Sequence, residues 1–169
     1  MSTTIIIIYV ILAACLVLPI YLFNKNSKNN TSKAHKAHLL EIKNHNLELK
    51  DQEEWHNLII GIDTNQNKLL YSKTTMNTND TTVISLSEIK HCKIVKSVRP
   101  INRKGKKENI LEKLALEFVY SKNNLPNILL EFYDVNGDFR EDFEMKRAEK
   151  WAGKVNTQLA ALSKSTMVA

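Results

Sequence analysis

Hydrophobic positions are unevenly distributed along the chain, and the densest run is at the N-terminus. Nineteen consecutive residues from Ile5 to Phe23 carry no charge, and most of them are Ile, Leu or Val. A helix of this length would measure about 28 Å, close to the hydrocarbon thickness of a bilayer, about 30 Å. The pattern therefore predicts a transmembrane anchor over residues 1–23, with Tyr21 near the headgroups.

Basic residues follow this apolar run, whereas none precedes it. The membrane-flanking lysines are Lys25, Lys28, Lys33 and Lys36, and the first acidic residue is Glu41. The positive-inside rule then predicts a single-pass membrane protein with a cytoplasmic C-terminal domain. In an alternative interpretation, residues 12–15 resemble a lipobox, so that Cys15 is lipidated and the domain is extracytoplasmic. The apolar residues after Cys15 and the lack of a basic residue before it disfavour this alternative.

Residues 24–54 predict a polar tether followed by a juxtamembrane helix. Residues 24–32 are polar without periodicity, which is typical of a flexible segment. Helix formers dominate residues 33–52, where Leu39, Ile42 and Leu49 predict a moderately amphipathic helix that packs on the domain or pairs with a second copy.

Three histidines, His35, His38 and His45, fall on this predicted helix. No thiolate or carboxylate nearby in the sequence would complete a tetrahedral metal site with them. We therefore expect solvated polar side chains, no metal site and no cofactor.

Residues 55–163 show the short, alternating apolar runs of a β-domain. Strands are predicted at 58–63, 68–73, 81–86, 91–99, 114–121, 128–133 and 139–143. The clearest alternation places Leu114, Leu116 and Phe118 on one face, and imperfect alternation in 91–99 indicates a bulge. Asn136-Gly137 is suited to a tight hairpin turn, because both residues tolerate positive φ.

A single amphipathic helix is predicted from Glu144 to Leu162, followed by a tail at 164–169. Its apolar stripe includes Ala148, Trp151 and Val155 at helical spacing. We interpret Trp151 as the core anchor of this helix, and Gly153 as a point of close approach to the sheet.

Seven short antiparallel strands closed by an amphipathic helix with a central Trp resemble the pleckstrin-homology-like fold. The resemblance covers residues 55–162 and depends on element order, on Asn136-Gly137 and on Trp151 in Ala-Glu-Lys-Trp-Ala. It implies a small antiparallel β-barrel or sandwich that the helix closes at one end. The predicted fold class is thus α+β, with a transmembrane helix and a linker helix ahead of this domain. Only Lys68 lies near the first hairpin turn, where the family's phosphoinositide site is built, so inositol-lipid binding is not implied.

The net charge of +6 is modest, but basic residues are concentrated in one segment. They are Lys90, Lys93, Lys96, Arg99, Arg103, Lys104, Lys106 and Lys107, with no acidic residue between them. Such a run is typical of a surface that contacts an anionic partner, or simply of a solvated loop. Nucleic acid is not expected, because no aromatic side chains are interleaved with the cations.

Sequence motifs give no support to catalysis. The two cysteines exclude a disulfide framework and a thiolate zinc site. Cys92 and His91 are adjacent, so in a strand they point to opposite faces and cannot form a nucleophile–base pair. The sequence predicts a non-enzymatic, membrane-tethered binding or scaffolding module without a small-molecule substrate, whose partners are the membrane and a protein or a second copy. The alternatives are an envelope lipoprotein and a small enzyme with an unrecognised site.

Overall fold

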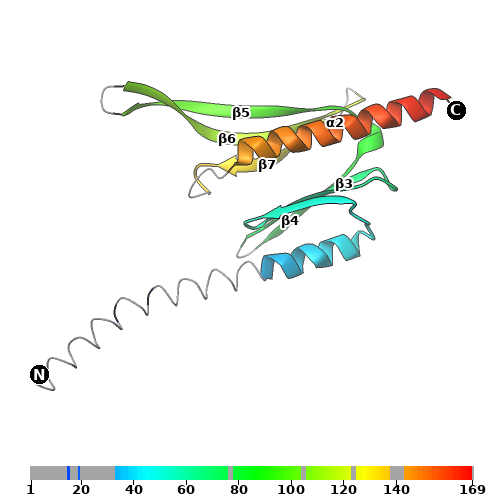
Figure 1. The fold of residues 1–169 in the computed structure, drawn as a ribbon, viewed down its shortest axis with the longest axis horizontal. Helices are drawn as coiled ribbons and strands as arrows, with labels where there is room; N and C mark the ends of the chain where they lie inside the picture. The colour runs from blue at the N-terminus through cyan, green and yellow to red at the C-terminus, as the bar shows by residue number, and fades with distance from the viewer. Residues whose placement is uncertain are drawn as a thin grey trace, which may run out of the picture. The chain divides into compact units, whose positions relative to one another are not determined.

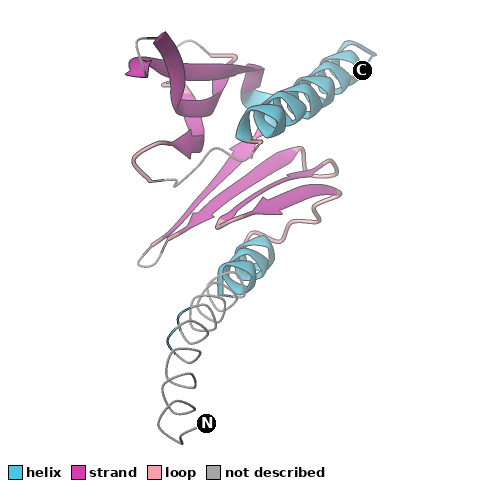
Figure 2. Cartoon of the chain, turned by 60° about the vertical axis from the view of Figure 1, so that its left-hand side comes forward, coloured by secondary structure: helices cyan, strands magenta, loops and turns pink. Residues whose placement is uncertain are grey.

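The computed structural model describes residues 15, 19, 33–75, 78–103, 106–122, 125–137 and 143–168. The chain divides into two compact units. The first comprises residues 1–63 and 70–83, and the second comprises residues 64–69 and 84–169. Helices and strands are distinguished by colour in Figure 2, and we describe each unit by itself.

In the first unit, residues 33–44 form a helix, which is shorter than the predicted helix at 33–52. The helix ends in a Schellman motif, in which the Asn46 N–H donates to the Lys43 carbonyl at 3.0 Å and the Leu47 N–H donates to the Ile42 carbonyl at 3.1 Å. Asn46 has a φ of 50°, the left-handed conformation that Asn tolerates better than most residues. The buried Leu47 then leads the chain away from the helix.

Four strands form the first sheet, in the order β1-β2-β3-β4. They are β1 (Asp51–Trp55), β2 (Leu58–Asp63), β3 (Lys68–Thr74) and β4 (Asn79–Ser85). Trp55 pairs with Leu58 across a two-residue turn, and His56 has the positive φ, 51°, that such a turn requires. β2 is buried along its whole length, as expected for a strand with almost no polar positions.

The second unit continues with η1 (Leu86–Glu88), β5 (Ile89–Arg103), β6 (Lys106–Tyr120), β7 (Ile128–Asp134) and α2 (Glu144–Val168). Its sheet has the order β5-β6-β7, and α2 runs along one face of it (Figure 1). Leu114, Leu116 and Phe118 of β6 and Trp151 and Val155 of α2 are fully buried. The alternating face of β6 and the stripe of α2 therefore build one core.

A side chain of α2 also closes part of an edge of this sheet. The backbone N–H of Cys92 in β5 donates to Asn156 Oδ1 at 3.0 Å, and Asn156 Nδ2 donates to the Cys92 carbonyl at 2.8 Å. The amide thus pairs with a peptide group of the edge strand as a neighbouring strand would. Asn156 consequently holds α2 in a definite position along β5.

Several predictions about the domain need correction. The described strands form two sheets and no closed barrel, so the predicted barrel is wrong, although the α+β class holds. β1 lies where the linker helix was expected. The strand predicted at 139–143 lies outside the described residues, apart from Phe143 in a bend. A Cβ at Gly153 would meet no described atom within 4 Å, so close approach to the sheet is also wrong.

The prediction of a transmembrane anchor is corrected as well. Among the described residues, no helix combines the length and the apolar character needed to cross a bilayer. The predicted span at 5–23 lies outside the described residues, apart from Cys15 and Pro19. The structure therefore does not support a single-pass, signal-anchored chain or the localisation derived from it. Lys25 and Lys28 lie outside the described residues, and Lys33 and Lys36 are exposed on the helix at 33–44.

Candidate functional site

The hairpin of β5 and β6 extends beyond the third strand of its sheet. β5 and β6 have 15 residues each, whereas β7 has 7 and pairs only with Lys113–Phe118 of β6. Beyond that point, residues 98–103 pair only with residues 106–111 among the described strands. We call these two segments the arm. Figure 1 shows the arm extending past the end of β7 as a twisted ribbon.

None of the described residues of the arm is buried. At its base, by contrast, Leu114, Leu116 and Phe118 are completely covered. A two-stranded hairpin without further packing is at best marginally stable in water, so the arm contributes little to the core of its unit. An exposed ribbon of this kind is suited to contact with another molecule.

The structure describes seven of the eight basic residues predicted for this site, and all seven are exposed. They are Lys90, Lys93, Lys96, Arg99, Arg103, Lys106 and Lys107, while Lys104 lies outside the described residues. They do not form one cluster, since Lys90 and Lys93 lie near the start of β5. The strand register places Arg103 opposite Lys106 and Asn102 opposite Lys107, so the positive charge is concentrated at the tip of the arm.

Acidic partners compensate the cations at the base of the hairpin. Lys93 Nζ lies 2.9 Å from Glu117 Oε2, and Lys113 Nζ lies 2.9 Å from Asp134 Oδ2. The hydrogen bond from Lys93 holds the pKa of the Glu117 carboxyl below its ordinary value. Within the described part of the chain, none of the arm cations forms an ion pair. These cations are Arg99, Arg103, Lys106 and Lys107.

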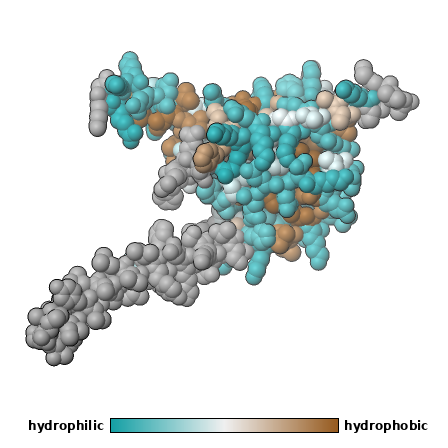
Figure 3. Space-filling model, in the orientation of Figure 1, coloured by the Kyte–Doolittle hydropathy of each residue, from teal (hydrophilic) through white to brown (hydrophobic). Residues whose placement is uncertain are grey.

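Apolar side chains lie among the charges of the arm. Val98 is 49% exposed, and Ile101 and Ile110 are partly exposed. Directly opposed residues of an antiparallel pair share a face, and Arg99 is opposite Ile110. Figure 3 shows hydrophobic colour along the arm behind a hydrophilic tip. The arm thus presents arginine next to apolar surface, a combination that is enriched in protein interfaces.

A second candidate lies in the first unit, where the helix at 33–44 meets its sheet. His38 is 0% exposed, with Nδ1 2.9 Å from Glu54 Oε1 and Nε2 3.1 Å from Thr74 Oγ1. His35 Nδ1 lies 2.7 Å from Oε2 of the same carboxylate. Burial raises the pKa of Glu54, but the hydrogen bonds and charges of the two histidines outweigh burial and lower that pKa below its ordinary value. The interpretation of the histidines as solvated is therefore wrong for His38.

Thr74, His38 and Glu54 stand in the order of a hydrolase triad, but the direction of the hydrogen bonds is unsuitable. Thr74 Oγ1 donates its single proton to Asn79 Oδ1 at 2.7 Å. A nucleophilic hydroxyl must instead give its proton to the imidazole. This arrangement therefore supports a structural network rather than a catalytic one.

Other reactive groups also lack the geometry of a site. The described residues contain no group of three or more His, Cys, Asp or Glu that could hold a metal ion. Burial raises the pKa of the Cys92 thiol to about 12, so the thiol stays protonated and unreactive. His91, its neighbour, is exposed on the opposite face of β5.

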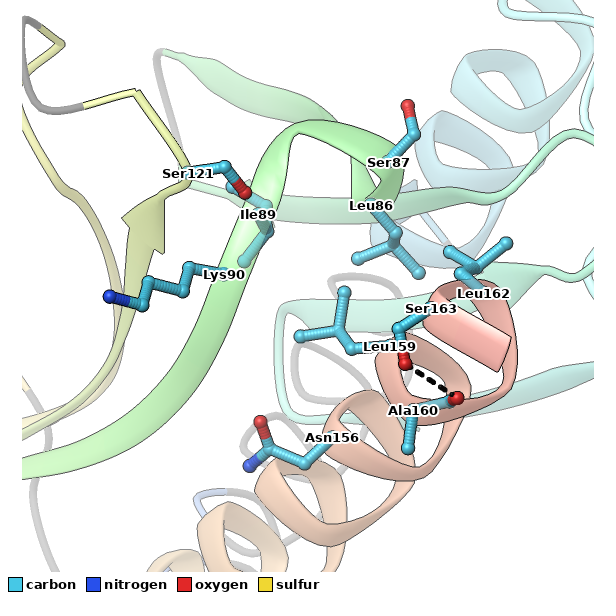
Figure 4. A pocket seen from close by; sticks show the side chains of 10 residues that line it. All are labelled: Leu86, Ser87, Ile89, Lys90, Ser121, Asn156, Leu159, Ala160, Leu162 and Ser163. Carbon is cyan, nitrogen blue, oxygen red and sulfur yellow. Dashed lines mark hydrogen bonds between the residues drawn. The ribbon is translucent and has the colours of Figure 1, made fainter. Parts of the chain in front are cut away.

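A cleft of about 500 Å³ lies in the second unit, between η1, the start of β5 and the second half of α2. Leu86, Leu159 and Leu162 gather on one side of it (Figure 4). The Ser163 hydroxyl donates a hydrogen bond to the Ala160 carbonyl at 2.9 Å, and the Lys90 side chain points away from the leucines. The lining therefore offers no convergent set of polar groups for a substrate.

Neither the His38 network nor the role of Asn156 was predicted from the sequence. For His38 the sequence did contain an indication, because Ala34, His38 and Ile42 are spaced four apart, as on one helix face. Ala34 is buried, so a histidine between it and Ile42 faces the sheet and needs polar partners there. Asn156 has no comparable indication.

Comparison with known proteins does not place the chain in a family. No family model, no curated protein and no solved structure matches it. The resemblance to the pleckstrin-homology-like fold thus stays a prediction.

Proposed function

We propose that the chain is a non-enzymatic binding module whose arm contacts an acidic protein surface. The observation that carries this proposal is a ribbon without a buried residue among those described, whose cations have no acidic partner in the described part of the chain. Each exposed ion pair with a partner contributes up to about 1 kcal/mol, and four together favour a complex measurably.

The apolar residues of the arm favour a protein over other polyanions. Val98, Ile101 and Ile110 would gain from burial against apolar groups of a partner, which a phosphate backbone does not offer. Residues 97–112 also contain no aromatic side chain for stacking on bases. An acidic protein surface with aliphatic side chains complements both the charge and the apolar area of the arm.

Fluorescence anisotropy tests this proposal with the full chain kept dispersed in a non-ionic detergent. The probes are a labelled peptide of Glu and Leu, a peptide of Glu and Ser with the same charge, and a short DNA duplex. We expect the Glu/Leu peptide to bind best. Replacing Arg99, Arg103, Lys106 and Lys107 together by Ser should weaken its binding about tenfold or more.

A matched control removes the same charge elsewhere. Lys33, Lys36, Lys43 and Lys164 are exposed and do not belong to the arm, and their joint replacement by Ser should change binding less than twofold if the arm cations make the contact. Equal losses in both variants would show unspecific electrostatic attraction and overturn the proposal. Tighter binding of the duplex would assign the arm to nucleic acid instead.

A further inference from the structure

The hydrogen bonds around His38 form one connected network, in which the orientation of the Asn79 amide sets the order of donors and acceptors. Asn79 Nδ2 donates to Glu41 Oε1 at 3.1 Å, so the amide nitrogen faces the carboxylate and the amide oxygen faces Thr74 and Ser72. A flipped amide would bring its oxygen against the carboxylate oxygen, and both atoms are acceptors. Glu41 therefore fixes the orientation of Asn79.

This orientation determines the proton of Thr74. Asn79 Oδ1 can only accept, so Thr74 Oγ1 at 2.7 Å donates its one proton to it. Thr74 then has only lone pairs to offer His38 Nε2, 3.1 Å away. Nε2 must therefore carry a proton of its own.

The other ring nitrogen of His38 must carry a proton too. Nδ1 lies 2.9 Å from Glu54 Oε1, and a carboxylate oxygen only accepts. With protons on both nitrogens the ring is an imidazolium, and Glu54 supplies the opposite charge that a buried cation needs. No described side-chain polar atom of this buried region is without a hydrogen-bond partner, which agrees with this assignment.

The other titratable groups of this hydrogen-bond network lie on β1 and on the helix at 33–44. Glu54 lies on β1, while His35, Glu41 and His45 lie on the helix at 33–44. β3 and β4 contribute neutral groups, namely Thr74, Ser72, Thr81 and Asn79. Glu54 thus bonds to His38 directly, whereas Glu41 is connected to it only through Asn79 and Thr74.

We infer that the helix at 33–44 is held on the first sheet by a proton-dependent lock, in which doubly protonated His38 bridges Glu54 on β1 and Thr74 on β3. Loss of the Nε2 proton leaves lone pairs facing each other, unless Thr74 turns and abandons Asn79. The first outcome removes a hydrogen bond between the helix and the sheet. The second removes the hydrogen bond from Thr74 that orients Asn79, the residue that in turn donates to Glu41 on the helix. The lock is closed while His38 keeps both protons, and it weakens as rising pH removes one. This inference is independent of the arm.

Nuclear magnetic resonance of the full chain, labelled with ¹⁵N at histidine, tests the lock directly. We expect both ring nitrogens of His38 to show imidazolium shifts under the conditions in which helix 33–44 is most strongly protected. Hydrogen exchange, corrected for the intrinsic effect of pH, should show the protection of helix 33–44 falling about tenfold when the ring loses its second proton. A singly protonated ring while the helix is fully protected overturns the inference. Helix protection that stays the same when the ring changes its protonation state overturns it as well.

Variants of Asn79 and Thr74 separate a proton lock from ordinary packing. Asn79→Ala frees the Thr74 proton for Nε2, so a neutral ring is accommodated and the pH dependence of helix protection should disappear. Thr74→Ser keeps the hydroxyl and should keep the pH dependence. Asn127→Ala, which removes an exposed amide bonded to Glu117 in the second unit, is the matched control and should leave the helix unchanged. If Asn79→Ala retains the full pH dependence, the proposed proton order is wrong.

Discussion

Alanine at Gly153 should stabilise the second unit. Gly153 is exposed in the interior of α2, and a Cβ there would meet no described atom within 4 Å. Glycine in a helix interior costs about 0.5–1 kcal/mol relative to alanine, because the unfolded chain loses more conformational freedom. With no clash to offset this gain, Gly153→Ala should raise the free energy of unfolding by about the same amount, 0.5–1 kcal/mol.

The same substitution at Gly61 should act in the opposite direction on the first unit. A Cβ on Gly61 would lie 2.6 Å from Leu49 Cδ1, 3.1 Å from the Asp51 carbonyl oxygen and 3.2 Å from Gln52 Cβ. Leu49 can rotate away, but the other two atoms belong to β1, which is paired with β2 at this position. Overpacking of this kind costs about 1–3 kcal/mol, and the entropy gain offsets up to about 1 kcal/mol of it.

Urea unfolding followed by hydrogen-exchange mass spectrometry measures both effects, because peptides report on each unit separately. Trp55 and Trp151 provide a fluorescence probe in the first and the second unit, respectively. We expect stabilisation confined to peptides of the second unit for Gly153→Ala, and destabilisation confined to the first unit for Gly61→Ala. If the free energy of unfolding changes in the same direction in both variants, the surroundings of the two glycines do not determine the effect of the added Cβ, and the prediction is wrong.

Three further predictions concern single groups. Cys92, whose pKa is raised to about 12 by burial, should resist a thiol reagent at pH 8 in the folded chain while the exposed Cys15 reacts, and both should react in urea. Asn156→Ala should destabilise the second unit by about 1–3 kcal/mol in urea unfolding, because the Cys92 peptide loses both bonds at the edge of β5. The pKa of Glu54 is lower in the folded chain than its ordinary value of 4.5, so the ionised carboxylate stabilises the fold above pH 4.5. This stabilisation is lost as the pH falls through the lowered pKa. Glu54→Gln should therefore flatten the acid limb of the curve of unfolding free energy against pH.

The parts of the fold that the sequence predicted well are those with a continuous buried face. Leu114, Leu116 and Phe118 alternate because α2 covers one side of β6, and the stripe through Trp151 repeats because the same core lies beneath it. Burial imposes a period on the sequence, and that period can be recognised without knowing the partner element.

The end of the first helix could not be predicted in this way. Residues 51–54, Asp-Gln-Glu-Glu, include good helix formers, yet they form most of β1. Asn46 ends the helix by taking a left-handed conformation, and the pairing of β1 with β2 then outweighs local preference. Helix propensity of a few tenths of a kcal/mol per residue is too weak to decide against a ladder of backbone hydrogen bonds.

The His38 network was not predicted because its members are far apart in the sequence. His38 is 16 residues from Glu54 and 36 from Thr74, and each of these residue types is ordinary in its own segment. Only the packing of the helix at 33–44 on β1 and β3 brings them together. The helical spacing of Ala34, His38 and Ile42 could therefore indicate that His38 faces the sheet, but not which residues it meets there.

The arm shows how a weak pattern can itself be informative. Residues 91–99 alternate imperfectly, and the structure has a register shift between Ser97 and Val98, where the arm begins. A strand alternates only where one of its faces is buried, and beyond this point the described residues of the arm bury neither face. Val98 and Ile101 therefore contribute nothing to a core, and the arm cations Arg99, Arg103, Lys106 and Lys107 are not the polar side of a half-buried strand. Neither packing nor ion pairs within the described residues explain this composition, and this supports the proposal that the arm contacts a surface outside the chain.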